Sequence, residues 1–381
     1  MSEAGTGKVL RTGRVLMKGN EAIAEAALRA GCRAYFGYPI TPQNELIAYM
    51  AANMMDRGGV FIQAESEVAA INMVFGASAA GVRAMTSSSS PGVSLKQEGI
   101  SYAAGADIPL VMANVVRGGP GLGAIGPAQS DYFQATRGGG HGDYRCIVLA
   151  PKSVQECADL TCMAFELSDK YRMPAIILAD GIIGQMMEGV VLPPAVDIRR
   201  LPRRDWAVGG MTGTGRASRH ITSLDLVPES LEAKTRTRFE RYETVKKEEV
   251  RFEAAGFKTS GGEFTGEGPD LTIVAYGTAA RVALGARQLA EKEGINLGLF
   301  RPITLWPFPY DALAKIASTG KPILTVEMSL GQLVEDVKLS VLEADPRAPR
   351  GAVHLLGHSG GVVPTEEEVY ARAKAILAEK A

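Results

Sequence analysis

The fold is decided by one segment, residues 60–90, which has the sequence VFIQAESEVAAINMVFGASAAGVRAMTSSSS. Its opening letters VFIQAE favour a strand, the small-residue run that follows favours a helix, and VRAMTS favours a second strand. Two strands joined through a helix form a βαβ unit, in which the strands are parallel and the crossover is right-handed. The segment therefore predicts a parallel sheet with helices packed on it.

The same alternation of strand and helix continues on both sides of this segment. Further strands are expected at four apolar runs: CRAYFGY (32–38), IPLVMANVV (108–116), CIVLAP (146–151) and MPAIILAD (173–180). Each run is apolar almost throughout, which indicates strands that are covered on both faces of the sheet. Residues 1–192 are therefore predicted to form a doubly wound α/β domain.

A second, smaller α/β domain is expected over residues 268–381. Its strands are predicted at LTIVAYG (271–277), NLGLFRP (296–302), KPILTVE (321–327) and AVHLLGH (352–358). Residues 193–267 form a linker that is richer in proline, glycine and charge, with one strongly charged helix expected over 228–255. That helix has only a narrow apolar stripe, formed by Leu231, Phe239, Tyr242 and Val245. The pattern predicts a strap across the domains or onto another subunit.

Composition excludes several classes of function. The chain of 381 residues has 41 Lys plus Arg against 42 Asp plus Glu, so its net charge of −1 argues against nucleic acid or an anionic membrane as partner. No apolar run approaches the roughly 20 residues of a membrane helix, and the N-terminus shows no export signal, so a cytoplasmic location is expected. The four cysteines form no CxxC pair, and no metal or cluster site is expected in this chain.

A glycine-rich loop follows the strand at 108–116. Gly121, Gly123 and Gly126 match the spacing GxGxxG, but the next letters are PAQSDYF instead of an apolar helix and a strand ending in an acid. A dinucleotide site needs both of those features. The loop is therefore better interpreted as a shaped segment that brings its backbone and Arg117 to a ligand. Neither a P-loop nor a GxSxG elbow is present.

Two further features each leave two interpretations open. The hydroxyl-rich run TSSSSPGVSL (86–95) is either a helix cap or the polar wall of a site at the carboxyl edge of the sheet. Glu67 lies at the junction of a strand and a helix. It is either a charge favoured by the helix dipole or an acid whose pKa is shifted by burial against a cofactor. Spacing alone favours the simpler interpretation of Glu67.

Several segments taken together resemble the alpha subunit of thiamine-diphosphate-dependent 2-oxoacid:ferredoxin oxidoreductases. They are GYPITPQNEL (37–46), the stretch 64–111 that contains the glutamate helix, RGGPGLG (117–123), QSDYFQATRGGGHGDYRCIVLAP (129–151) and RPITLWPFP (301–309). The likeness runs in order along nearly the whole chain. It implies that the first domain is of the thiamine pyrimidine-binding type and that the last resembles the C-terminal domain of transketolase.

The resemblance assigns a role to the turn YPITP. Carried over by position, Tyr38, Pro39, Ile40 and Thr41 line the thiamine pocket, and Thr41 offers its hydroxyl to the 2-oxo acid. Pro39 and Pro42 would hold the backbone of this turn in one geometry.

The resemblance also assigns Glu67 and Arg117. Glu67 matches the glutamate that hydrogen-bonds the pyrimidine ring nitrogen and promotes the imino form of thiamine, whereas Glu65 matches no such position. Arg117 matches the arginine that faces the substrate carboxylate, which a guanidinium recognises through paired hydrogen bonds. The resemblance thus names Glu67, Thr41 and Arg117 as the catalytic set.

What the chain lacks defines its expected partners. The family's Asp-Gly-Asp run for diphosphate and Mg2+ is absent, as are the cysteines of a [4Fe–4S] cluster. The resemblance therefore implies a beta subunit that carries both, with gamma and ferredoxin-like delta chains. The implied reaction is oxidative decarboxylation of a 2-oxo acid to CO2 and acyl-coenzyme A, with ferredoxin as electron acceptor. The same site could run the reaction in reverse, and the resemblance implies a role in anaerobic metabolism.

The substrate is predicted from the glycine-rich stretch 118–145. It looks most like the subgroup acting on branched acids such as 3-methyl-2-oxobutanoate. The alternative substrate, 2-oxoglutarate, would need a second cation, which Arg137, His141 or Arg145 could supply.

Two other functions are compatible with the same fold. The chain could be a non-catalytic scaffold subunit, but retention of Thr41, Glu67 and Arg117 together counts against that. A self-contained thiamine enzyme of the transketolase kind is disfavoured because the diphosphate motif is missing.

Overall fold

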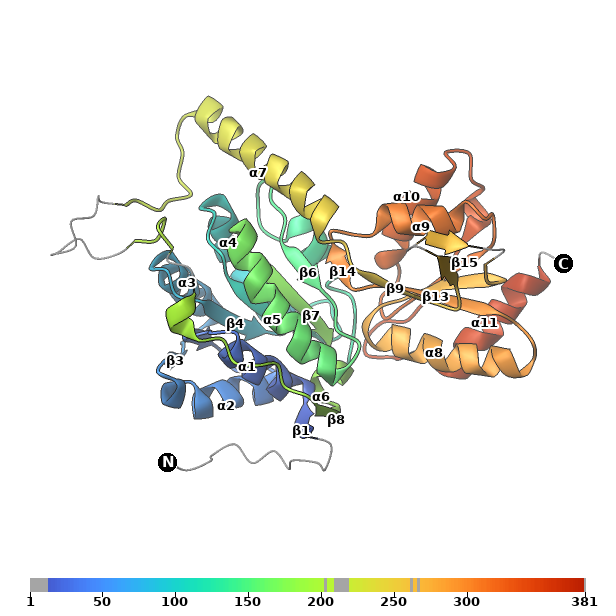
Figure 1. The fold of residues 1–381 in the computed structure, drawn as a ribbon, viewed down its shortest axis with the longest axis horizontal. Coiled ribbons are helices and arrows are strands. Elements are labelled where there is room, and N and C mark those ends of the chain that lie inside the picture. The colour runs from blue at the N-terminus through green and yellow to red at the C-terminus, as the bar shows by residue number, and fades with distance from the viewer. Residues whose placement is uncertain (1–12, 202–203, 209–218, 261–262, 266–267, 380–381) are drawn as a thin grey trace.

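The structure, a computed structural model, describes residues 13–201, 204–208, 219–260, 263–265 and 268–379. Two sheets, one of seven strands and one of five, form the centres of two neighbouring bodies (Figure 1). Within the described part of the chain, no helix is both long and apolar enough to cross a membrane.

The first sheet has the strand order β14-β6-β7-β5-β4-β2-β3, and all of its strands are parallel except β14. Its strands are β2 (Ala34–Gly37), β3 (Val60–Gln63), β4 (Ala84–Ser88), β5 (Val111–Val116), β6 (Ile147–Leu149), β7 (Ala175–Asp180) and β14 (Thr304–Trp306). Strands β4, β5, β6 and β7 are buried throughout. The parallel α/β sheet predicted from the apolar runs is therefore confirmed.

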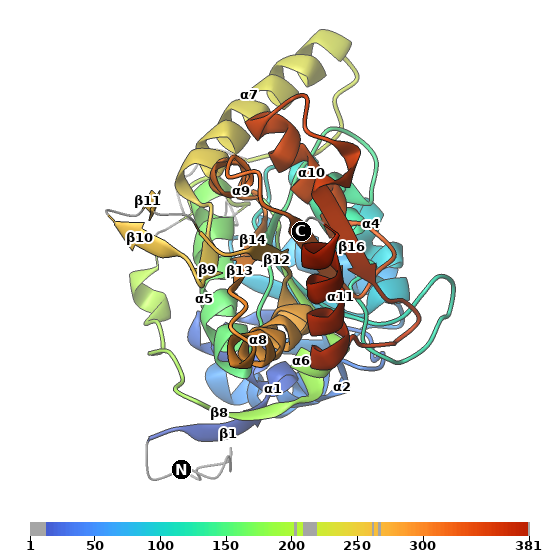
Figure 2. The same cartoon turned by 90° about the vertical axis from the view of Figure 1, so that its right-hand side faces the viewer.

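The helices of this domain connect successive strands. They are α1 (Gly19–Arg29), α2 (Asn44–Asn53), α3 (Glu67–Ala79), α4 (Ser90–Gly105), α5 (Val154–Tyr171) and α6 (Gly181–Gln185), with short turns at Met55–Arg57, Gln134–Gly138 and Ile198–Arg200. Helix α1 packs between α2 and α5, while α3 and α4 form a second pair. Strands β1 (Val15–Lys18) and β8 (Met187–Val190) make a separate antiparallel ribbon, seen at the lower edge of Figure 2.

The second sheet has the order β16-β15-β12-β13-β9, with β9 antiparallel to its neighbour. Its strands are β9 (Phe252–Ala255), β12 (Leu271–Val274), β13 (Leu297–Pro302), β15 (Ile323–Glu327) and β16 (Val353–Gly357). Its helices are α8 (Gly277–Lys292), α9 (Tyr310–Ala317), α10 (Leu333–Ala344) and α11 (Glu366–Ala378), after a short turn at Arg350–Ala352. Helix α8 packs on α11 and α9 packs on α10 (Figure 2).

Each of the two sheets takes one edge strand from outside the segment that was predicted to form it. Strand β14, from the late segment RPITLWPFP, leaves the second block and adds to the edge of the first sheet beside β6. Strand β9, from the segment predicted as linker, adds to the edge of the second sheet beside β13. Each exchange satisfies the backbone hydrogen bonds of an otherwise open edge, a requirement that a local sequence pattern does not express.

The charged helix is shorter than predicted. Helix α7 (Pro228–Glu248) ends at Glu248, and the expected helical residues 252–255 instead form strand β9. Phe252 there stacks on Phe300 with ring centroids 5.0 Å apart, a contact made from a strand. The lone hairpin β10 (Lys258–Ser260) and β11 (Glu263–Thr265) follows.

Helix α7, the predicted strap, packs on the first domain through charged side chains more than through its apolar stripe. Tyr242 and Val245 are buried, but Leu231 and Phe239 are 42% and 37% exposed, so half of the predicted stripe is wrong. Arg238 is also buried, and it pairs with Asp107 of the first domain. Helix α7 runs along the first domain toward its junction with the second (Figure 1).

The junction between the domains is held by buried polar contacts. Asp180, at the end of β7, accepts hydrogen bonds from the backbone N and the hydroxyl of Thr278 at 2.9 and 2.7 Å. Gln129 bonds Met328 through both its backbone N and its Oε1, each at 2.9 Å, and donates to the Tyr276 carbonyl at 2.8 Å. Burial raises the pKa of Asp180, and the four hydrogen bonds that it accepts oppose that shift.

We predict that Asp180→Ala lowers the free energy of unfolding by about 2–4 kcal/mol, because it leaves buried donors on both domains unpaired. Denaturant titration of the purified protein measures the change. Asp143→Ala, which removes an exposed carboxylate from a loop, is the control and should be within about 0.5 kcal/mol of the parent. Equal stability of the two variants would show that Asp180 does not hold the junction.

Candidate active site

The candidate residues gather at the carboxyl edge of the first sheet. The turn 38–42 follows β2, Glu67 follows β3, Ser89 and Ser90 follow β4, and Arg117 follows β5. In the order β5-β4-β2-β3, the chain runs from β2 outward to β3 and then back past β2 to β4. Ligands of open α/β sheets bind where the strand order reverses in this way.

Hydrogen bonds from neighbouring side chains hold the turn 38–42 in place. The carbonyl of Pro42 accepts hydrogen bonds from Asn20 at 2.8 Å and from Gln185 at 2.6 Å. The side chain of Gln43 is fully buried and donates to the Tyr38 carbonyl at 3.2 Å. These side chains support the backbone of the turn at both of its ends.

The four residues assigned to the thiamine pocket differ in accessibility. Pro39 and Thr41 are exposed, while Tyr38 and Ile40 are half-buried. The Thr41 hydroxyl accepts a 3.3 Å hydrogen bond from Asn44 at the start of α2. The turn thus presents its apex to the outside, and its role in binding remains a prediction.

Arg117 ties the turn to the glycine-rich loop. Its two terminal nitrogens donate to the Thr41 carbonyl at 2.9 Å and to the Leu122 carbonyl at 3.0 Å. The side chain is buried, and none of the described residues offers its Nε a hydrogen-bond partner. Arg117 and Thr41 therefore lie together as predicted, but in this structure the guanidinium holds main-chain carbonyls.

Glu67 is the first residue of α3, whose N-cap Ser66 accepts a hydrogen bond from the Ala69 amide. Its side chain is only 6% exposed, and among the described residues no donor bonds its carboxylate. It lies against Gly92 of α4, where an added Cβ would come within 2.5 Å of Glu67 Oε1 and 2.2 Å of Ser88 Oγ. Only glycine leaves room for the carboxylate at this place.

Lys96 is a site residue that sequence reasoning missed. It is fully buried, and its Nζ donates to Thr86 Oγ1 at 3.1 Å and to the main-chain oxygen of Glu67 at 3.4 Å. Burial lowers the pKa of Lys96 to about 8, against the opposing effect of the Glu67 charge. The available signal was spacing, because Gly92 and Lys96 are four residues apart and share one face of a helix.

These residues fit the pyrimidine part of thiamine. A pyrimidine ring needs a carboxylate acceptor and nearby hydroxyls. Within the described residues the Glu67 carboxylate has no donor, and the buried hydroxyls of Ser88 and Ser89 have no partner. The N-cap residue of α4, Ser89, makes no side-chain cap hydrogen bond, so the helix-cap interpretation of the hydroxyl-rich run is wrong, and its role in a site remains a prediction. The described residues contain no group of three His, Cys, Asp or Glu placed to hold a metal.

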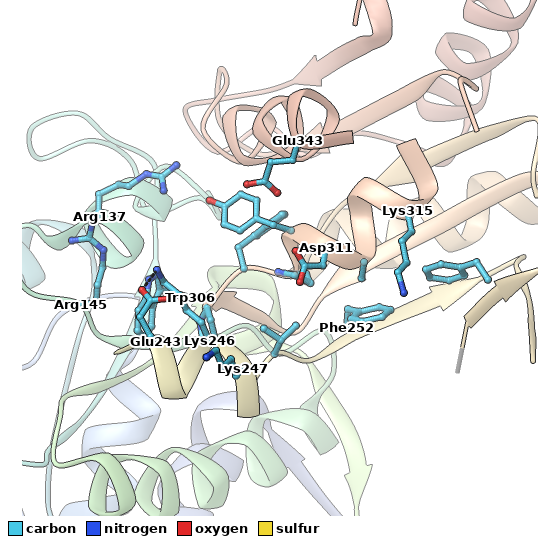
Figure 3. A pocket seen from close by; sticks show the side chains of 17 residues that line it. Arg137, Arg145, Glu243, Lys246, Lys247, Phe252, Trp306, Asp311, Lys315 and Glu343 are labelled. Atoms are coloured by element: carbon cyan, nitrogen blue, oxygen red, sulfur yellow. Dashed lines mark hydrogen bonds and ion pairs between the residues drawn. The ribbon is translucent and has the colours of Figure 1, made fainter. Parts of the chain in front are cut away.

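The cations proposed for a second carboxylate are engaged elsewhere. Arg137 pairs with the buried Asp336 at 2.8 Å, and Arg145 donates to the Tyr144 carbonyl at 2.7 Å. Both line a cavity of about 840 Å³ at the domain junction, whose other walls include Trp306 (Figure 3). His141 is exposed and lies edge-on to Tyr102. None of these contacts involves Arg117 or the turn 38–42.

Glu65, unlike Glu67, lies at the surface of the protein. It is exposed and accepts a 3.1 Å hydrogen bond from Ser66. It is a surface acid beside the cap of α3, and its assignment as a structural acid remains a prediction.

Comparison with known proteins shows two matching family models. The first is described as "Pyruvate flavodoxin/ferredoxin oxidoreductase, thiamine diP-bdg" and matches residues 25–248. The second is described as "Pyruvate:ferredoxin oxidoreductase core domain II" and matches residues 269–369.

Curated relatives cover most of the chain. It is 49% identical over 325 residues to ketoisovalerate oxidoreductase subunit VorB of Methanothermobacter marburgensis, covering 85% of this chain and 89% of that subunit. It is 39% identical over 329 residues to 2-oxoglutarate synthase subunit KorA of Archaeoglobus fulgidus, covering 85% and 90% of the two chains.

Two solved structures are similar. One is a 2-oxoglutarate:ferredoxin oxidoreductase from Magnetococcus marinus with 2-oxoglutarate, coenzyme A and succinyl-CoA bound, at a TM-score of 0.78 and 26% identity. The match covers 96% of this chain and 65% of that one, so this chain spans about two thirds of its length. The other is a split-gene transketolase, at a TM-score of 0.58 and 17% identity over 96% and 99% of the two chains, a likeness of fold alone.

We predict that Gly92→Ala lowers the affinity for thiamine diphosphate at least about 10-fold in the chain assembled with its partner subunits, because the new methyl displaces Glu67 or Ser88. Equilibrium titration with the cofactor measures this. Gly76→Ala is the matched control, since a Cβ on this α3 glycine meets nothing within 4 Å. Unchanged affinity in Gly92→Ala would show that the close approach of α4 to Glu67 is unrelated to the cofactor.

Proposed function

The chain belongs to the thiamine-diphosphate-dependent 2-oxoacid:ferredoxin oxidoreductases, and on that premise we propose that it supplies the pyrimidine half of their active site and acts on a branched-chain 2-oxo acid. The observation that carries the proposal is the Glu67 carboxylate, nearly buried and without a donor beside Gly92. When bound, thiamine supplies the carbanion chemistry of decarboxylation. The residues of this chain would hold its pyrimidine ring and the substrate.

Each candidate residue has a separate task in this proposal. The Glu67 carboxylate accepts a hydrogen bond from the protonated pyrimidine nitrogen, and the burial of the carboxylate strengthens this bond. Thr41 offers a hydroxyl to the 2-oxo acid from the outer side of the turn. Arg117, whose Nε has no hydrogen-bond partner among the described residues, would bind the substrate carboxylate, giving up one or both of its present bonds to the Thr41 and Leu122 carbonyls.

The proposal requires a partner subunit. Exposed apolar side chains occur on the edge strand β3, on α3 and α4, and on the glycine-rich loop: Val60, Ile62, Val68, Met73, Leu95, Leu122 and Ile125. Exposed apolar side chains that gather on one surface mark protein interfaces, and we infer that the partner docks over these elements. The partner would be a beta subunit that brings the diphosphate anchor, Mg2+ and a [4Fe–4S] cluster, within a cytoplasmic complex that also holds gamma and delta chains.

The substrate proposal rests on two supports. The relative named for ketoisovalerate is 49% identical, whereas the relative named for 2-oxoglutarate is 39% identical. Of the three candidate cations for a second carboxylate, Arg137 and Arg145 already contact Asp336 and the Tyr144 carbonyl, and His141 lies edge-on to Tyr102. The product would be the branched acyl-coenzyme A with CO2, and the two electrons would pass to ferredoxin.

The substrate is tested by following anaerobic reduction of ferredoxin with coenzyme A and a panel of 2-oxo acids, using the chain co-expressed with its neighbouring subunits. We predict that 3-methyl-2-oxobutanoate gives a higher kcat/KM than 2-oxoglutarate. The reverse order would contradict the substrate and keep the family chemistry. No turnover with any acid, in a complex that retains thiamine and iron, would favour the scaffold alternative.

We predict that Glu67→Gln slows proton exchange at the reactive carbon of bound thiamine at least about 100-fold, because an amide cannot hold the ring nitrogen as a carboxylate does. Hydrogen–deuterium exchange of the cofactor, measured in the assembled complex, reports the rate. Glu65→Gln is the matched control two residues away and should exchange at the parent rate. Near-normal exchange in Glu67→Gln would remove this residue from the mechanism.

We predict that Arg117→Ala raises KM for the 2-oxo acid about 10- to 100-fold, since it removes the cation facing the carboxylate. Steady-state kinetics of the complex measure this, and Arg145→Ala is the control cation. If Arg117→Ala leaves KM unchanged and Arg145→Ala raises it, the substrate carboxylate lies with Arg145 instead.

A further inference from the structure

Lys96 lies inside the contact between α3, α4 and β4, where a lysine is unexpected. A fully buried lysine is rare unless it is paired with an acid. Here its hydrogen-bond partners are neutral oxygens, the Thr86 hydroxyl at 3.1 Å and the Glu67 carbonyl at 3.4 Å. The protein therefore keeps an ammonium group in its interior with no direct carboxylate contact.

The packing around Lys96 is tight because glycines flank it on the same face of α4. Gly92 lies one turn before it, against the Glu67 carboxylate, and Gly99 lies about one turn after it. An added Cβ at Gly99 would come within 2.6 Å of Ile71 on α3. The two helices thus approach closely on either side of Lys96, and its amine is delivered to the first turn of α3.

Among the described residues, one carboxylate acts on the charge of Lys96. Glu67 on α3 is the carboxylate whose charge favours the ammonium form, and Thr86 on β4 contributes only a hydroxyl. Glu98, the nearest acid on α4 itself, is exposed and accepts a hydrogen bond from Tyr102. Glu67 and Lys96 therefore form an isolated pair of charges in a low-dielectric interior, where they act strongly on one another.

We propose that Lys96 is a positioning residue for Glu67: its buried ammonium, held on the main-chain oxygen of Glu67 and the Thr86 hydroxyl, places a positive charge beside the residue whose carboxylate binds the pyrimidine nitrogen of thiamine. This rests on the proposed function. The positive charge stabilises the carboxylate, so the proton shared in that hydrogen bond stays on the ring nitrogen and no net transfer occurs to Glu67. Lys96 touches neither cofactor nor substrate, and it acts only through Glu67.

A dependence on pH follows. Burial lowers the pKa of Lys96 to about 8, so the ammonium is present at pH 7 and is lost as the pH rises above 8. The support for Glu67 is lost over the same range. A lysine that served only to fill space would show no such coupling.

The test compares the assembled complex with its Lys96→Met variant between pH 6.5 and 10. Thiamine diphosphate affinity and the near-ultraviolet circular dichroism of the bound cofactor are both recorded. We expect the variant to bind about 10-fold more weakly at pH 7 and the two proteins to converge at pH 10, where neither carries the charge. Lys338→Met, which alters an exposed lysine on α10, should match the parent throughout.

A difference in affinity that is the same at pH 7 and pH 10 would overturn the proposal and leave Lys96 a structural role. Should Lys96→Met fail to fold, the parent complex still decides the matter through its own titration. A step in affinity near pH 8 that disappears in Glu67→Gln supports the coupling, and the absence of a step contradicts it. If the parent complex binds no thiamine diphosphate at all, the proposed function fails, independently of Lys96.

Discussion

The site depends on one constraint, the reversal of direction that the chain makes around β2. Because β3 is added on one side of β2 and β4 on the other, the turn after β2 lies beside the start of α3 and the serines after β4. Right-handed crossovers then place α3 and α4 together on one face. Gly92 allows α4 to reach the Glu67 carboxylate, and Arg117 closes the same edge by holding the Thr41 carbonyl.

A second consequence is that the chain presents an incomplete polar site. Buried polar groups normally have partners, yet in the part of the chain that the structure describes the hydroxyls of Ser88 and Ser89 and the Nε of Arg117 have none. Arg117 also bonds the carbonyl of Leu122, whose side chain is 82% exposed. The proposal that a partner subunit completes the site accounts for polar groups without partners beside an exposed apolar side chain. The metal-binding part of the site would belong to that subunit.

Sequence patterns predicted the parts of this molecule that local chemistry determines. The apolar runs located the buried strands of both sheets, and the junction of strand and helix placed Glu67 at the sheet edge. Patterns did not predict strand exchange, because nothing within residues 301–309 or 252–255 says which distant edge will pair with them. They also missed Lys96, since a lysine in a helix is ordinarily solvated and its burial arises only when Gly92 and Gly99 bring α3 close.

Whether this chain holds half of a thiamine site is decided by calorimetric titration of thiamine diphosphate with Mg2+, first into the isolated chain and then into the complex with its co-expressed subunits. We expect one cofactor bound per copy of this chain in the complex. Binding to the isolated chain should be at least about 1,000-fold weaker, because the partner is proposed to supply the anchor for diphosphate and metal. Equal affinity in both would contradict the proposal and show that the chain binds the whole cofactor by itself.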